Sequence, residues 1–135
     1  MIRKGKPKLA IVSLADCEGC QLEFFSLENR FPLLWQKFEI VSWRLLQNKS
    51  DQDNIDILLI EGTPITKEER EEVKRLRKKA TLVGSLGSCA DLGGINAILT
   101  TKERKKAFKK AFKKNRPIKR EVKPLGEYID LDFKI

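Results

Sequence analysis

The sequence predicts an α/β fold in which helices cover both faces of an open, mostly parallel sheet. Short apolar stretches alternate along the chain with segments of helical spacing, which is typical of βαβ units. Several of these stretches are apolar at nearly every position, as expected for parallel strands that are buried on both faces. The chain has 135 residues, of which 41% are hydrophobic, and this suits one domain with a single core. We therefore expect residues 1–135 to form one domain of the flavodoxin-like or Rossmann kind.

The first half of the chain contains three expected strands and one expected helix. The apolar stretch 8–14 predicts the first strand, and the alternating stretch 39–45 predicts the second. Leucine and phenylalanine recur at intervals of three and four over residues 17–37, which predicts a helix that Pro32 should kink or end. The strongly apolar stretch 55–60 predicts the third strand.

The second half begins with a charged helix. Thr66 and Glu69 have the spacing of a capping box, so we expect this helix to run from Thr66 to about residue 79. Residues 80–83 predict the fourth strand, which opens into the glycine-rich stretch 84–94. A short helix is expected over residues 95–100.

The last part of the chain is basic and closes with an expected strand. The net charge is +9, and the segment 101–123 holds twelve Lys and Arg against two acids. A basic amphipathic helix is expected over residues 102–114, with Pro117 as its stop. Residues 128–135 alternate in polarity and predict the last strand. The basic segment suits three roles: a solvated helix packed on the domain, a contact with a partner subunit, or binding to nucleic acid or a membrane surface.

Membrane insertion and secretion are not expected. No apolar run approaches the ~18–20 residues needed to cross a bilayer. The basic N-terminus is followed by a short apolar stretch that closes on Asp16 rather than on a cleavage site of small residues. We therefore expect a cytoplasmic protein.

The positions of the three cysteines are the most informative feature for function. Cys17 and Cys20 follow the first expected strand as C-x-x-C, Cys89 follows the fourth, and Glu61 comes at the end of the third. The carboxyl ends of parallel strands meet at one edge of a sheet, where ligands bind in open α/β folds. We therefore expect the three thiols at the same edge. The helix expected after Cys17 should lower the pKa of the Cys17 and Cys20 thiols.

The thiol chemistry remains open at this level. An odd number of cysteines argues against a disulfide framework, and the absence of histidine excludes imidazole ligands and imidazole catalysis. The C-x-x-C pair could be two cysteines packed as small apolar side chains. A thioredoxin-like dithiol would also explain the pair, but it leaves Cys89 and the glycine-rich stretch unexplained. Structural zinc and iron–sulfur clusters both normally take four ligands, so the spacing alone does not choose between them.

Three motifs, in this order and at this separation, resemble one family. They are Ala-Asp-Cys-Glu-Gly-Cys-Gln-Leu-Glu at 15–23, Leu-Ile-Glu-Gly at 59–62, and Gly-Ser-Leu-Gly-Ser-Cys-Ala-Asp-Leu-Gly-Gly at 84–94. The pattern resembles the small subunit of nickel–iron hydrogenases, in particular the cytoplasmic delta-type subunits, and the related 20 kDa subunit of NADH:quinone oxidoreductase. The resemblance covers residues 8–100 and, more loosely, the last strand.

The resemblance implies a flavodoxin-like domain that holds the proximal 4Fe–4S cluster. Cys17, Cys20 and Cys89 would be the cluster ligands, with Glu23 and Glu61 close to the cluster. The implied partners are a hydrogenase-type large subunit, which carries the nickel site, and other electron-transfer subunits. The chain would then be an electron-transfer subunit of an oxidoreductase complex rather than a complete enzyme.

The sequence departs from the family at the fourth ligand. In the family this cysteine lies in a Gly-Cys-Pro segment after a strand resembling residues 122–135, and the chain contains no such segment. The expectation is a fourth thiolate on a separate polypeptide, a truncated chain, or an incomplete cluster. An alternative hypothesis is a basic thiolate–zinc module that docks on nucleic acid, and another is a truncated, non-functional relic.

Overall fold

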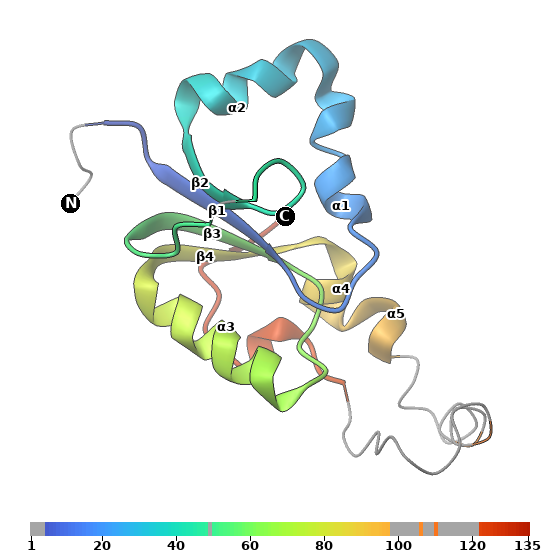
Figure 1. Cartoon of the computed structure of the whole chain (residues 1–135). Helices are drawn as coiled ribbons and strands as arrows, with labels where there is room; N and C mark the ends of the chain where they lie inside the picture. Colours follow the sequence, from blue (N-terminus) through green and yellow to red (C-terminus); the bar gives the residue numbers. More distant parts are fainter. Residues whose placement is uncertain (1–4, 49, 98–105, 107–109, 111–121) are drawn as a thin grey trace.

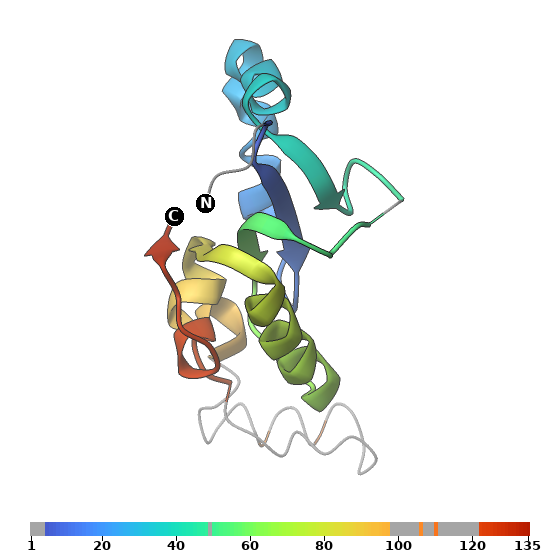
Figure 2. The same ribbon diagram turned by 90° about the vertical axis from the view of Figure 1, so that its left-hand side faces the viewer.

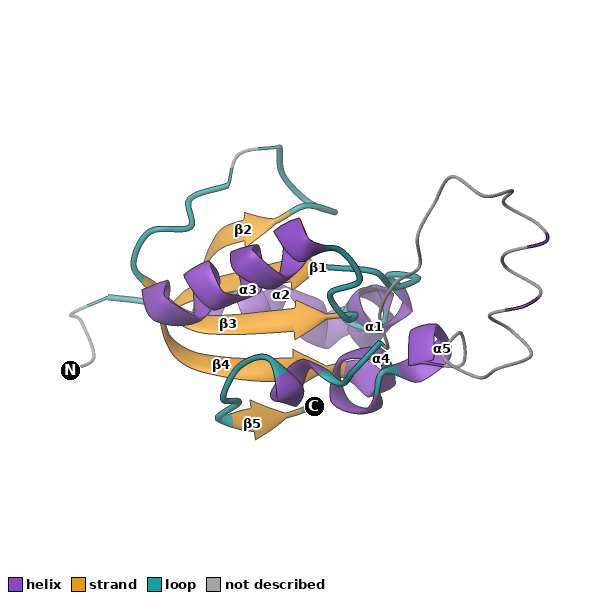
Figure 3. Cartoon of the chain, turned by 90° about the horizontal axis from the view of Figure 1, so that it is seen from below, coloured by secondary structure: helices purple, strands orange, loops and turns teal. Residues whose placement is uncertain are grey.

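The computed structural model describes residues 5–48, 50–97, 106, 110 and 122–135, and these residues contain one five-stranded sheet. Its strand order is β2-β1-β3-β4-β5, and every neighbouring pair is parallel (Figures 1 and 3). The strands are β1 (Lys8–Ser13), β2 (Glu39–Trp43), β3 (Ile55–Glu61), β4 (Ala80–Leu86) and β5 (Phe133–Lys134). This is the strand order of flavodoxin-like folds, so the predicted fold class is confirmed.

Helical segments lie on both faces of the sheet and at its carboxyl edge. They are α1 (Gly19–Leu22), the 3₁₀ segment η1 (Phe25–Arg30), α2 (Phe31–Lys37), α3 (Lys67–Lys79), α4 (Gly87–Leu92), α5 (Gly94–Ala97) and the 3₁₀ turn η4 (Leu125–Glu127). Segments α1, η1 and α2 cover one face, whereas α3 and η4 cover the other (Figures 1 and 2). The arrowheads of β3 and β4 point toward α1, α4 and α5 (Figure 3).

Helix α3 is defined by the capping box that the sequence predicts. The Thr66 side chain accepts a hydrogen bond from the Glu69 backbone N–H, and the Glu69 carboxylate accepts one from the Thr66 N–H. The buried side of α3 places Val73 and Leu76 against the core residues of β3 and β4. The core on this face is therefore aliphatic.

The core on the opposite face is built around Trp43, which is 1% exposed at the end of β2. The rings of Phe24 and Phe31 meet the Trp43 ring edge-on, with centroids 5.6 Å and 6.3 Å away. Leu9 and Leu59 complete this aromatic cluster from β1 and β3. The short segments α1, η1 and α2 are thus held on the sheet by aromatic packing.

The prediction of one helix over residues 17–37 is wrong. Glu28 has a φ of +47°, a backbone conformation that interrupts a right-handed helix, and the segment divides into α1, η1 and α2. Pro32 lies in the first turn of α2 and neither kinks nor ends a helix. A backbone N–H in the first turn has no hydrogen-bond acceptor within the helix, so its absence in proline costs nothing there. The apolar residues keep a helical spacing along the sequence because α1, η1 and α2 all pack on the same core.

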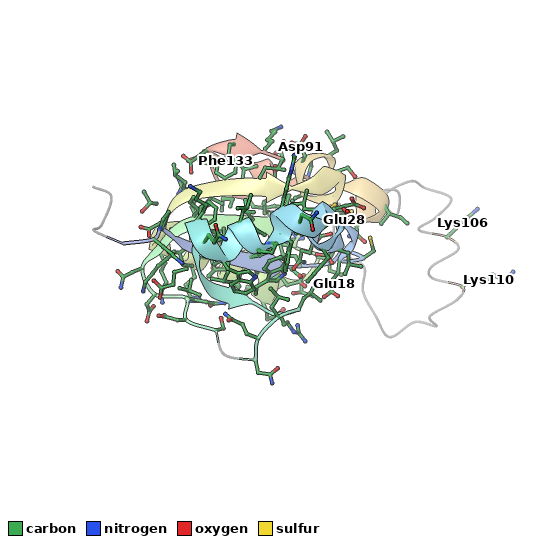
Figure 4. The ribbon with its side chains drawn as sticks, turned by 90° about the horizontal axis from the view of Figure 1, so that it is seen from above. Glu18, Glu28, Asp91, Lys106, Lys110 and Phe133 are labelled. Carbon is green, nitrogen blue, oxygen red and sulfur yellow. The ribbon has the colours of Figure 1, made fainter. Side chains whose placement is uncertain are left out.

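The fourth and fifth strands also differ from expectation. Strand β4 runs three residues further than predicted, because Leu86 still pairs with Glu61 of β3. The last strand is only Phe133–Lys134, since the preceding residues turn through η4 to bury Leu125 and Ile129 in the α3-side core. Asp91 of α4 and Phe133 lie along the edge of the molecule where β5 ends, and Asp91 forms an ion pair with Lys134 (Figure 4).

Most of the basic helix expected over residues 102–114 lies outside the described residues. The same holds for its expected stop at Pro117 and for the end of the short helix expected over residues 95–100. Within the basic segment the structure describes Lys106, Lys110, Val122 and Lys123, and the three lysines are exposed. Lys106 and Lys110 are labelled in Figure 4. The short helix begins one residue earlier than predicted, as α5.

Leucine-to-alanine substitution tests the buried side of α3. Leu76 is fully buried, so we expect Leu76→Ala to lower the free energy of unfolding by about 2–5 kcal/mol through the cavity it leaves. Leu82 on β4 is 43% exposed, and the same change there should cost no more than about 1 kcal/mol. Urea unfolding of both variants measures the difference, and equal losses would contradict the packing described here.

Candidate metal centre

All three cysteines lie at the carboxyl edge of the sheet. Cys17 is in the loop after β1, Cys20 is in α1, and Cys89 is in α4, directly after β4. Figure 3 shows α1 and α4 together beyond the ends of these strands. Cys17 is exposed, and the other two thiols are half-buried. The topology therefore brings the three predicted ligands to one edge, as the strand positions led us to expect.

The turn between Cys17 and Cys20 is shaped by local hydrogen bonds. The Asp16 carboxylate accepts a hydrogen bond from the Glu18 N–H at 2.9 Å, and Glu18 has a φ of +59°. Burial and the nearby carboxylates of Glu61 and Glu18 raise the pKa of Asp16. The hydrogen bond and the positive φ of Glu18 shape the turn that leads into α1 at Gly19.

Glycine backbone lies directly against the thiols. A Cβ on Gly87 would be 2.2 Å from the Cys20 Sγ, and a Cβ on Gly94 would be 2.6 Å from the Cys89 Sγ. Both glycines also have positive φ, +79° and +51°. Because Gly87 is the first residue of α4, this contact sets the Cys20 thiol beside the helix that carries Cys89.

The environment of Cys20 combines burial with several nearby acidic groups. Burial raises the pKa of the Cys20 thiol, and the neighbouring Glu61, Cys89 and Cys17 raise it further. The expectation that the helix start lowers this pKa is therefore wrong, because burial and nearby negative groups outweigh the four-residue helix. A metal bound at Cys20 would have to displace the thiol proton.

Three thiols flanked by glycine backbone are a donor set that fits an iron–sulfur cluster. Within the described residues, no three Cys, Asp or Glu side chains lie close enough together to hold one metal ion. In an iron–sulfur cluster each thiolate binds a different iron atom of the group. Thiols from the segment after β1 and from α4, flanked by glycines that leave no side chain in the way, suit such an inorganic group.

Glu61 is the predicted acid that the structure joins to the cysteine motif. Its side chain is 1% exposed at the end of β3, and its two carboxylate oxygens accept hydrogen bonds from the backbone N–H groups of Cys20 and Gln21. These donor–acceptor distances are 3.1 Å and 3.3 Å. Glu61 thus holds the backbone at the second cysteine. Glu23, by contrast, is exposed after α1 and accepts a hydrogen bond from the Ser26 hydroxyl, so its place beside a cluster stays a prediction.

Two residues that sequence reasoning missed also support this edge. Asn96 of α5 donates to the Ala15 carbonyl, and Ala15 forms an antiparallel bridge with Thr63. The loop before Cys17 is thereby tied to α5 and to the segment after β3. Gln21 is completely buried beside Cys20. Its one sequence signal is a polar residue directly after the second cysteine; no comparable signal marks Asn96.

Relatives and a solved structure resemble this chain along most of its length. It is 27% identical over 130 residues to the sulfhydrogenase 2 subunit delta of Pyrococcus furiosus, covering 95% of this chain and 54% of the relative. It is 29% identical over 110 residues to the NAD-reducing hydrogenase HoxS subunit delta of Cupriavidus necator, covering 82% of this chain and 53% of the relative. The chain therefore spans only about half the length of these curated relatives.

The fold has a close structural counterpart. A chain in the crystal structure of NAD+-reducing [NiFe]-hydrogenase in the H2-reduced state superposes with a TM-score of 0.83 at 24% identity, covering 96% of this chain and 81% of that one. The described residues include no helix long and apolar enough to span a membrane.

A family model described as NADH ubiquinone oxidoreductase, 20 kDa subunit, matches residues 17–135. Since that match covers most of its length, the chain belongs to the NADH ubiquinone oxidoreductase 20 kDa subunit family.

Proposed function

We propose that the chain is the electron-transfer small subunit of a cytoplasmic nickel–iron hydrogenase or hydrogenase-like oxidoreductase complex. The observation that carries this proposal is the approach of Cys17, Cys20 and Cys89 at one edge of the sheet, against glycine backbone. The named relatives, which are hydrogenase subunits, support it. In this proposal the chain is one component of an oxidoreductase and not a complete enzyme.

The proposed cofactor is a 4Fe–4S cluster held by Cys17, Cys20 and Cys89. When bound, such a cluster supplies one-electron transfer at a potential set by charge, hydrogen bonding and solvent exposure. The chain itself contributes three thiols, and the fourth ligand would come from outside residues 1–135. Ile135 lies beside this edge, because its carbonyl oxygen accepts a hydrogen bond from the Gly87 N–H at 2.8 Å.

The proposed partners are a large subunit that carries the nickel site and further electron-transfer subunits. Exposed apolar side chains next to the cysteines favour such contacts: Leu22 in α1 is 55% exposed, and Leu92 in α4 is 68% exposed. Ile95, one residue into α5, is 65% exposed. A surface of this kind suits coverage by another subunit better than permanent contact with water.

The competing hypotheses receive less support. A thiolate–zinc module receives no support from the relatives described above, which are hydrogenase subunits. The relatives described above give no support to a module that docks on nucleic acid. We further propose that residues 1–135 form one flavodoxin-like iron–sulfur domain, with the basic segment 101–123 as an appendage.

Serine substitutions test the cluster directly. Replacing Cys17, Cys20 or Cys89 by Ser, one at a time, should lower the iron content several-fold relative to the unmodified chain, because a hydroxyl is a poor substitute for a thiolate. Ser88→Ala, at the exposed position before Cys89, is the matched control and should retain iron. Iron, sulfide and zinc analysis of anaerobically purified chains is the measurement. Zinc in place of iron, or unchanged iron in all three variants, would contradict the proposal.

Alanine at Gly87 tests the packing of glycine against the Cys20 thiol. The new methyl group would clash with the Cys20 Sγ at a backbone position with positive φ, so Gly87→Ala should cost at least about 1–2 kcal/mol of stability and reduce iron loading. Gly126→Ala is the control, because a Cβ there would meet only the Leu131 Cδ1 at 3.7 Å. Thermal unfolding and iron analysis check both effects. The account is contradicted if the two variants behave alike.

A further inference from the structure

We propose that Gln21 is a positioning residue for Cys20, acting through a buried chain of hydrogen bonds that begins at Trp43. This inference rests on the proposed function, because it concerns how the chain presents one cluster ligand. It assigns roles to two residues, Gln21 and Trp43, whose side chains carry no recognised iron or sulfur chemistry.

The Gln21 side chain is hydrogen-bonded on every side. Its Nε2 donates to the Glu61 Oε2 at 2.8 Å and also to the Ser13 hydroxyl, and its Oε1 accepts from the Trp43 Nε1 at 2.9 Å. Both amide hydrogens and the carbonyl oxygen therefore have protein partners. Gln21 is 0% exposed and Trp43 is 1% exposed, so water cannot replace a lost partner.

These contacts draw on three different strands. Ser13 ends β1, Trp43 ends β2 and Glu61 ends β3. The Gln21 side chain is thus hydrogen-bonded to the ends of three neighbouring strands at the carboxyl edge. These hydrogen bonds, together with the one from the Gln21 backbone N–H to Glu61, fix the orientation of α1 on the sheet.

The connection to Cys20 is short. Gln21 is the next residue in the same four-residue helix, and the Glu61 carboxylate that accepts from Gln21 also accepts from the Cys20 N–H. Removing the Gln21 amide would leave one Glu61 oxygen with a single backbone donor at 3.3 Å and the Trp43 Nε1 without a partner. We expect Cys20 to become mobile, because a helix of one turn has little stability of its own.

The experiment uses the full chain with two substitutions in the network. Gln21→Met keeps the length of the side chain and removes its polar atoms, whereas Trp43→Phe keeps the aromatic packing and removes the Nε1 donor. Val73→Ala, in the core on the opposite face of the sheet, is the control for a general loss of stability. Hydrogen exchange at the Cys20 and Gln21 amides is measured without iron, and cluster loss to a chelator is measured after anaerobic reconstitution.

The expected result is a local effect. Gln21→Met should speed cluster loss about tenfold, the scale known for residues that orient metal ligands, and should speed exchange of the Cys20 amide by a similar factor. Trp43→Phe should have a smaller effect in the same direction. The double variant should be no worse than Gln21→Met, since both changes break the same chain of hydrogen bonds. Val73→Ala should change neither rate beyond its effect on global unfolding.

Two results would overturn the inference. One is a Gln21→Met chain whose amide exchange and cluster loss match those of the unmodified chain. The other is a Val73→Ala chain of equal thermal stability that loses its cluster as fast as Gln21→Met, which would reduce Gln21 to an ordinary core residue. Absence of a cluster in the unmodified chain would instead refute the proposed function. In that case, the amide hydrogen-exchange rates of Cys20, compared between Gln21→Met and the unmodified chain, would alone test whether Gln21 positions Cys20.

Discussion

The arrangement of the carboxyl edge depends on one buried carboxylate, that of Glu61. A carboxylate without hydrogen-bond donors is very costly away from water, so its position at the end of β3 demands partners. The backbone of α1 supplies them at Cys20 and Gln21, and the Gln21 side chain adds a third. This requirement brings the C-x-x-C motif onto the sheet, although α1 has only one turn and could not hold itself there.

The remaining thiols are placed by topology and by glycine. Parallel pairing of β1, β3 and β4 brings the loop of Cys17 and the helix of Cys89 to the edge that Glu61 organises. Gly87 then allows α4 to approach the Cys20 thiol more closely than any side chain would permit. Burial, Glu61 and the two other cysteines together raise the pKa of Cys20, and Cys89 reaches this edge from a different backbone segment than the C-x-x-C motif.

The sequence predicts most of this framework, because the strands are short, apolar and separated by clear helix signals. The capping box at Thr66 and the placement of Glu61 at a strand end are both confirmed. The division of the segment 17–37 escaped prediction because it depends on the backbone conformation of Glu28, which leaves the spacing of apolar residues unchanged. The role of Gln21 escaped for a different reason: its partners come from three strand ends that only the assembled sheet brings together.

A crystal structure of the full chain, purified and crystallised without oxygen, tests the central claim most directly. The claim is that Cys17, Cys20 and Cys89 of one chain hold a single iron–sulfur cluster at the carboxyl edge of the sheet. The account predicts anomalous density for iron at this edge, within bonding distance of all three sulfurs, with the Cys20 backbone still hydrogen-bonded to Glu61. A disulfide between Cys17 and Cys20, or a lone metal ion bound by only some of the thiols, would contradict it.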